Sequence, residues 1–334
     1  MGSLPQRWLA SLLLILLAGF GQSGAAAQGA PVELEGRTYL PLTLVAARMG
    51  MDAYWLKGFQ TYRLRSRWSN IDFPRSGYTA RINGVQVHLG FPTRLHDGVL
   101  HLSEHDFQHV VQAILTPQVF DQPLEVQRIV IDPGHGGKDP GAVIQQPALQ
   151  EKDLALETSL YLAERLREHG FEVILVRDRD VFIALQERAR VANRGRGDLF
   201  VSVHFNAAAN RAASGIEVFS LAPVGQPSSG RTEVTAADRR VHPGNALDAR
   251  NTLAAYHLQR SLLAATGAVD RGAKRARFAV LRPLETPGVL VELGFMTHAP
   301  TAAKLQDSAH LRALADALAD GIVAYRDQLA RFVD

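Results

Sequence analysis

The chain has 334 residues, of which 46% are hydrophobic, so it is long enough for two domains and apolar enough for a packed core. Disorder throughout is therefore excluded. The chain has no cysteine, which excludes disulfides, thiolate metal sites, a cysteine nucleophile and a lipobox anchor. Any bound metal must be held by histidine and carboxylate. The net charge of +3 is mild and the basic residues are not clustered, so no nucleic-acid partner is expected.

The first 27 residues have the pattern of an export signal. Arg7 supplies a positive start, an apolar run spans 8–20, and Ala25-Ala26-Ala27 offers a cleavage site of small residues. The alternative, a membrane anchor, is disfavoured because the run is shorter than the roughly 20 residues that cross a bilayer. We expect 1–27 to be a signal peptide and the mature chain to lack a membrane span. The expected location is the periplasm or cell envelope, with the extracellular space left open.

Residues 28–117 predict a small α+β accessory domain with a weak internal duplication. A hairpin turning at Glu35-Gly36 precedes an apolar helical stretch at 42–49, and a hairpin turning at Asp97-Gly98 precedes a helical run at 107–115. The repeated unit resembles the small domain named after the N-terminal region of copper amine oxidases. No activity follows from that resemblance.

A linker at 118–127 leads into a second domain, 128–334, in which helical and strand patterns alternate. The alternation predicts an α/β fold with a central, mostly parallel sheet flanked by helices. The expected strands are at 126–131, 171–176, 199–204, 215–220, 278–281 and 289–293, and the expected helices at 154–169, 184–193, 249–265 and 311–329. Functional side chains are expected at strand ends, where the loops converge.

Four polar residues interrupt the apolar strand ends of this domain. His135 lies between glycines after the first strand, Glu151 opens a helix, and His204 ends a buried strand. Two imidazoles and one carboxylate on loops or element ends are the ligand set of a catalytic zinc that keeps one position open. Glu292 is a lone acid in the apolar strand VLVELGF, and burying it without a role would cost several kcal/mol.

From about Arg128 to its C-terminus the chain resembles the zinc-dependent N-acetylmuramoyl-L-alanine amidases with His-Glu-His ligands. The motifs, in the family's order, are IDPGHGGKDPGA, EKDLALE, VILVRDRD, DLFVSVHFNA, GIEVFSL, RGAKRARFAVLR and VLVELGF. The resemblance implies that His135, Glu151 and His204 bind Zn²⁺ and that Glu292 is the catalytic acid and base. It also implies hydrolysis of the amide between the lactyl group of N-acetylmuramic acid and L-alanine.

Two further polar residues near the cluster have open roles. Asn206 can hydrogen-bond substrate or a ligand side chain, or it can turn the backbone after its strand. Asp132 can orient a ligand histidine, or it can be a turn residue. Arg177 and Arg188 are expected to pair with nearby acids such as Asp178 and Glu187, outside the active site.

Two other segments are open to more than one interpretation. The stretch 222–250, rich in Pro, Gly, Ser and charge, is expected to be a solvated loop, with a lid over the site as the alternative. His101, His105 and His109 recur at helical spacing and predict an exposed helix face rather than a second metal site.

Three hypotheses for function remain from the sequence. The favoured one is an amidase acting on peptidoglycan, with the need for a protein activator left open. The second is a zinc peptidase of the stem peptide, which uses the same chemistry in a different substrate pocket. The third is an inactive wall-binding or regulatory protein, which has no reason to retain a buried Glu292.

Overall fold

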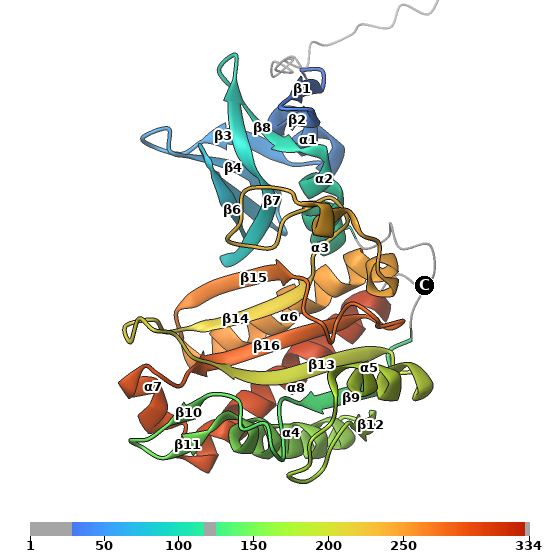
Figure 1. The fold of residues 1–334 in the computed structure, drawn as a ribbon. Coiled ribbons are helices and arrows are strands. Elements are labelled where there is room, and N and C mark those ends of the chain that lie inside the picture. Colours follow the sequence, from blue (N-terminus) through green and yellow to red (C-terminus); the bar gives the residue numbers. More distant parts are fainter. Residues whose placement is uncertain (1–28, 117–124, 331–334) are drawn as a thin grey trace, which may run out of the picture.

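The computed structural model of the chain describes residues 29–116 and 125–330. A smaller part packs on a larger one, and the two share one continuous β-sheet (Figure 1). The expected signal peptide and most of the expected linker, 118–127, lie outside the described residues. None of the helices in the two described ranges combines the length and apolar character needed to cross a bilayer.

The smaller part is built from short antiparallel strands and a few helical turns. Its strands are β1 (Val32–Leu34), β2 (Arg37–Pro41), β3 (Asp52–Trp55), β4 (Thr61–Arg65), β5 (Asn70–Pro74), β6 (Gly77–Ile82), β7 (Val85–His96) and β8 (Val99–Ser103). Its helices are α1 (Leu42–Met49), α2 (Glu104–Asp106), the π-helix η1 (Phe107–Gln112) and α3 (Ala113–Leu115).

The predicted hairpin–helix repeat is present. The pair β1–β2 leads into α1, and the pair β7–β8 leads into α2. Both hairpins turn through two residues with positive φ, Glu35 and Gly36 in one and Asp97 and Gly98 in the other. This backbone matches the right-handed twist of the flanking strands, which explains why an acid followed by glycine marks both turns.

The larger part is an α/β unit. Its main strands are β9 (Arg128–Pro133), β12 (Glu172–Leu175), β13 (Leu199–Asn206), β14 (Ile216–Leu221), β15 (Asp270–Ala276) and β16 (Gly288–Phe295), with a small hairpin of β10 (Val143–Ile144) and β11 (Leu149–Gln150). Its helices are α4 (Glu151–Glu168), α5 (Leu185–Arg194), η3 (Ala236–Arg239), η4 (Pro243–Leu247), α6 (Asp248–Thr266), α7 (Ala299–Lys304) and α8 (Ser308–Ala330).

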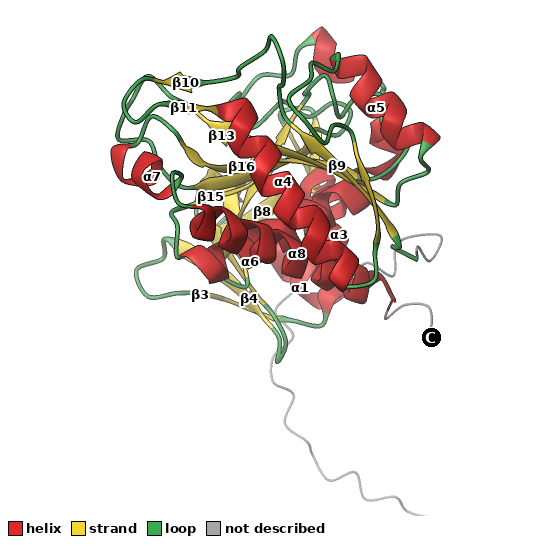
Figure 2. Cartoon of the chain, turned by 90° about the horizontal axis from the view of Figure 1, so that it is seen from below, coloured by secondary structure: helices red, strands yellow, loops and turns green. Residues whose placement is uncertain are grey.

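The main sheet has the order β12-β9-β13-β16-β14-β15, and only the β16–β14 pairing is antiparallel. The expectation of a mostly parallel sheet flanked by helices is confirmed. Helices α4, α6 and α8 lie side by side over one face (Figure 2), while α5 packs on the other face. Near the carboxyl ends of β9 and β13, His135 and His204 are partly exposed.

One expected strand is wrong. Residues 278–281 form a turn in which Phe278 O accepts a hydrogen bond from Leu281 N at 3.1 Å. Val280 and Leu281 are buried against α5. Their apolar character therefore reflects packing, while the strand of this region, β15, begins eight residues earlier in a stretch too polar to be recognised.

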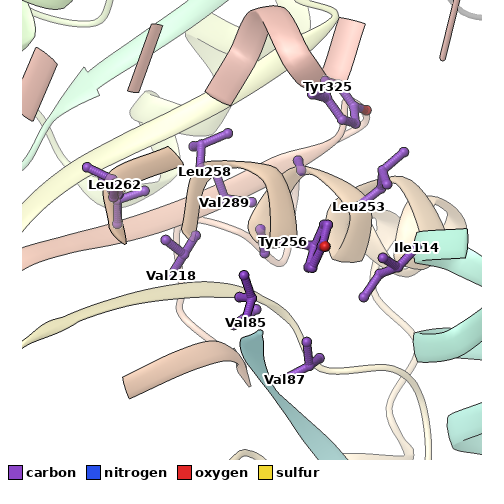
Figure 3. Packing of buried hydrophobic residues seen from close by; sticks show 14 of the residues in the cluster. Val85, Val87, Ile114, Val218, Leu253, Tyr256, Leu258, Leu262, Val289 and Tyr325 are labelled. Atoms are coloured by element: carbon purple, nitrogen blue, oxygen red, sulfur yellow. The ribbon is translucent and has the colours of Figure 1, made fainter. Parts of the chain in front are cut away.

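The two parts share a hydrophobic core. Tyr256 and Leu253 of α6 pack toward Val85 and Val87 of β7 and toward Ile114 of α3 (Figure 3). The strands also join directly, since Ala273 of β15 pairs in parallel with Val87. The small part therefore continues the sheet of the larger part.

Arg275 is the central polar group of this contact. The side chain is 1% exposed and donates to the backbone oxygens of His88 and His109 in the small part and to Thr252 Oγ1 in α6. A buried guanidinium requires such partners, because desolvation without hydrogen bonds is costly. Arg275 of β15 thus connects β7 and η1 of the small part with α6 of the larger part.

The segment 222–250 also belongs to this contact. It leaves β14 beside the amino end of β16, because Ser220 pairs with Val289. Gln226 is 1% exposed, and its Oε1 lies 3.1 Å from His105 Nε2 in the small part. The segment is therefore a packed connection at the end of the sheet opposite the strand carboxyl ends, and it is neither a lid nor a fully solvated loop.

The three spaced histidines do not form an exposed helix face. His101 lies in β8, because the helix begins only after Ser103, whose Oγ accepts a hydrogen bond from Asp106 N. The His101 residue is 3% exposed. The rings of His105 and His109 lie 4.4 Å apart between centroids, and both are partly buried.

The buried histidines at the contact predict a pH-dependent stability. Burial is the main cause that lowers the pKa of His88, His105 and His109 to about 4. As the pH falls from about 6.5 to 4, the unfolded chain binds protons that the folded chain does not, so the free energy of unfolding falls. We expect a loss on the order of 1 kcal/mol for each histidine.

Urea unfolding of the wild type and of a His105→Gln/His109→Gln variant measures this loss. Comparing variants matters because Asp248, whose pKa burial raises to about 7, gives the opposite pH dependence in both proteins. The double variant should lose less stability between pH 6.5 and 4 than the wild type. His96→Gln, at a histidine whose side chain is 42% exposed, should lose as much stability as the wild type. Equal losses in all three proteins would contradict the prediction.

Candidate metal centre and active site

The three predicted ligands meet at the carboxyl ends of β9 and β13. His135 lies in the loop after β9, Glu151 is the first residue of α4, and His204 lies near the end of β13. Glu151 Oε1 is 3.0 Å from His135 Nε2 and 2.8 Å from His204 Nδ1. One ligand atom from each side chain lies within 4.8 Å of the others.

Glycines make room for this cluster. A Cβ at Gly134 would lie 2.5 Å from His204 Cε1, and a Cβ at Gly141 would lie 2.6 Å from Glu151 Oε2 and 2.7 Å from His135 Cδ2. Since any side chain at either position would overlap the cluster, these glycines are required by close approach. The loop also turns sharply, with φ of +59° at His135 itself.

The donor set fits a metal ion. His135 Nδ1 lies 3.0 Å from Asp139 Oδ2, and this contact orients the ring so that Nε2 faces Glu151. Glu151 also accepts a hydrogen bond from Ala142 N at 2.9 Å, which orients the carboxylate. Two imidazoles and a carboxylate without any thiolate match a catalytic zinc site with an open position. Within the described ranges, this is the one group of three or more such side chains close enough to share an ion.

The charge of Glu151 is compatible with metal binding. Burial raises the pKa of its carboxyl, but hydrogen bonds from His135 and His204 outweigh burial and hold the pKa well below its usual range. The carboxyl is therefore ionised at any pH at which the protein would be active, as a metal ligand must be.

Glu292 lies beside this cluster on β16. It is the register partner of His204 on β13 and of Glu217 on β14. Its Oε2 is buried and has no hydrogen-bond partner among the described residues. Burial, followed by the charges of Glu151 and Glu217, raises the pKa of Glu292 well above its ordinary value. An unpaired carboxyl of this kind is expected where a group must exchange a proton with substrate.

Asp132 does not reach a histidine. Its carboxylate accepts hydrogen bonds from Arg188 Nη1 and Ser202 Oγ, both at 2.7 Å, and it is 1% exposed. Asp139, four residues beyond His135, instead has the orienting position that was one of the two roles left open for Asp132. Asn206 likewise bonds neither a ligand nor the backbone turn, since its Nδ2 donates to Glu217 Oε1 at 2.8 Å.

The expected partners of Arg177 and Arg188 are wrong. Arg177 donates to Pro133 O and Gly134 O, at 3.0 and 2.7 Å. Arg188 donates to Pro133 O and His135 O, at 2.8 and 2.5 Å. Both guanidinium groups therefore hold the backbone that carries His135. The sequence offered no signal for this, because the acids adjacent in the chain pair with other arginines at the surface.

Comparison with known proteins identifies the family to which this site belongs. Residues 129–324 match the family described as N-acetylmuramoyl-L-alanine amidase. The chain belongs to this family. The match begins inside β9 and ends inside α8, so it covers all the residues of the cluster and Glu292.

Individual relatives support the assignment. The uncharacterized protein YqiI of Bacillus subtilis is 33% identical over 207 residues, which cover 62% of this chain and 88% of YqiI. The amidase LytC of the same organism is 33% identical over 203 residues, which cover 61% of this chain and 36% of LytC. Among solved structures, an N-acetylmuramoyl-L-alanine amidase of Clostridium difficile 630 superposes with a TM-score of 0.51 at 29% identity, covering 61% of this chain and 98% of that one.

Arg188 provides a test of how this amidase site is held. Arg188→Met should free the loop around His135 and leave Asp132 buried with its charge unpaired. We expect divalent-metal affinity to fall about 10- to 100-fold and stability to fall by about 3 to 5 kcal/mol. Competition with a chelating dye and denaturant unfolding measure the two effects.

The matched control is Arg190→Met, which removes an exposed arginine of the same helix. It should change neither quantity appreciably. If Arg188→Met bound metal as tightly as the wild type, the position of His135 would not depend on Arg188.

Proposed function

We propose that this chain hydrolyses the amide bond between the lactyl group of N-acetylmuramic acid and L-alanine in peptidoglycan. His135, Glu151 and His204 would hold Zn²⁺, and Glu292 would act as general acid and base. The observation that supports the proposal best is the pairing of a three-ligand cluster with a buried, unpartnered carboxyl on the adjacent strand.

The chain's own residues would perform the proton transfers. When bound, Zn²⁺ acts as a Lewis acid and makes an activated water available near neutral pH. Glu292 Oε2, which has no hydrogen-bond partner among the described residues, is free to accept the proton of the attacking water. The raised pKa of Glu292 favours its keeping that proton until the alanine nitrogen can receive it. An amide nitrogen departs readily only when it is protonated, so one carboxyl suffices for both steps.

The surrounding groups would keep the reacting residues in place. Asp139 orients the His135 ring, and Arg177 and Arg188 clamp the loop that carries it. His204 lies near a strand end and Glu151 at a helix start, which are rigid supports, and such preorganisation contributes to catalysis.

Export and domain division belong to the same proposal. We infer a cleaved signal at 1–27, an accessory domain at 28–117, a linker at 118–127 and a catalytic domain at 128–334, with activity in the periplasm or cell envelope. The apolar run at 8–20 and the alanines after it support export. The two hairpin–helix units support the resemblance of 28–117 to the copper amine oxidase N-terminal domain. A protein activator remains part of the proposal without a residue assigned to bind it.

The central test is hydrolysis of purified peptidoglycan by the mature protein. We expect wild-type protein with zinc to release stem peptides with new L-alanine amino termini. A chelator should abolish release, and added zinc should restore it. Glu292→Gln should lower kcat by about 10²- to 10⁴-fold while zinc remains bound, because only the proton transfer is lost.

The matched control is Glu285→Gln, at an exposed glutamate on the loop before β16, which should retain activity. New amino termini on residues other than L-alanine would identify a stem-peptide peptidase instead. Glu292→Gln with wild-type activity would refute the assigned role. A zinc-loaded wild type that binds peptidoglycan without cleaving it would favour the inactive, wall-binding alternative.

A further inference from the structure

A second polar group lies next to Glu292 on the same face of the sheet. Glu217 of β14 is the register partner of Glu292, and β15 lies on the other side of β14. Arg271 and Lys274 of β15 both reach Glu217. These side chains form a row across neighbouring strands. It runs from Glu292 on β16 through Glu217 on β14 to the two cations on β15.

Glu217 is contacted by two cations. Glu217, 4% exposed, accepts hydrogen bonds from Asn206 Nδ2 at 2.8 Å, Arg271 Nε at 2.7 Å and Lys274 Nζ at 2.6 Å. One carboxylate thus faces two cations. The Lys274 side chain is only 15% exposed, so the buried acid is paired with a buried lysine as well as with the more exposed arginine.

Arg271 presents its free end outward. Its Nε bonds Glu217, but Nη1 and Nη2 have no hydrogen-bond partner among the residues of the two described ranges. The side chain is 34% exposed, and its Cζ lies 4.8 Å from the centroid of the Phe295 ring. A guanidinium held at Nε and packed on a ring is oriented in advance, and its two outer nitrogens match the two oxygens of a carboxylate.

The small part fixes the backbone of Arg271. His88 Nε2 and Gln86 Nε2 lie 3.2 and 3.4 Å from Arg271 O. The next residue is Gly272, with φ of +92°, where a Cβ would lie 3.0 Å from both Gln86 O and His88 Cδ2. The β7 strand therefore packs against the strand that carries Arg271, and the small part supports the backbone of this arginine.

We propose that Arg271, with Lys274 beside it, is the receptor for a free α-carboxylate on the stem-peptide residue that follows the L-alanine. This inference rests on the proposed function. Strands lie about 4.8 Å apart, so Arg271 is on the order of 10 Å from Glu292 across β14. A peptide spans up to about 3.6 Å per residue, so the α-carboxyl of the second residue reaches the arginine while the scissile amide lies at Glu292.

The test uses two muramyl peptides that differ only in the second residue, which carries either a free α-carboxylate or an α-carboxamide. The wild type should cleave the carboxylate form with a kcat/KM at least about tenfold higher, mainly through a lower KM. Arg271→Gln should bring the ratio near one by losing activity on the carboxylate form alone. Arg271→Lys keeps the charge but loses the two outer guanidinium nitrogens, so it should give a kcat/KM ratio between those of the wild type and Arg271→Gln. Arg312→Gln, at an exposed arginine of α8, should keep the wild-type ratio.

Calorimetry provides a readout that does not depend on turnover. Metal-depleted wild type should bind the dipeptide with the free carboxylate at least about tenfold more tightly than its α-amide, and Arg271→Gln should bind the two equally. A preference that persists in Arg271→Gln overturns the inference, as does a wild type that treats the two ligands alike. If the wild type shows the binding preference but cleaves neither the two muramyl peptides nor peptidoglycan, the proposed function fails while the assignment of Arg271 as a carboxylate receptor stands.

Discussion

The parallel pairing of β9, β13 and β16 is the constraint on which the rest of the site depends. Parallel strands end at the same edge of a sheet, so this register brings the loop after Pro133, His204 and Glu292 together from positions up to 159 residues apart. Glu151 completes the group because α4 begins at that edge, and its carboxylate lies between the two histidines. A shift of one residue in β16 would turn Glu292 into the helix-covered core.

The loop that carries His135 needs further support, because it has left the hydrogen-bond ladder of the sheet. A buried ion pair between Asp132 and Arg188 provides it. Arg188 also donates to the backbone oxygens of Pro133 and His135, and Arg177 donates to the backbone oxygen of Gly134. Such a pair is worth little as a source of stability by itself. Its value here is that it holds one backbone conformation, with His135 at positive φ.

The small part is a structural extension of the catalytic unit. It adds β7 to the edge strand β15, shares the core under α6, and surrounds Arg275 with backbone oxygens. The segment 222–250 packs into the same contact through Gln226. This arrangement covers an edge of the sheet that would otherwise expose unpaired backbone groups. It also places the side chains of His88 and Gln86 against the backbone oxygen of Arg271, so the small part contacts the strand next to the one that pairs with Glu292.

The sequence by itself determined the α/β class and the hairpin turns, and its resemblance to the amidase family predicted His135, Glu151, His204 and Glu292 as the site. These signals are local: an acid followed by glycine at a turn, a histidine between glycines, and a lone acid in an apolar strand each stand out against neighbours in the chain. Only the tertiary structure decided the partners of Asp132, Asn206, Arg177 and Arg188, the place of 222–250, and the union of the two parts through β7 and β15. Those features depend on contacts between residues distant in the chain, and a long polar side chain can reach several partners that local patterns do not distinguish.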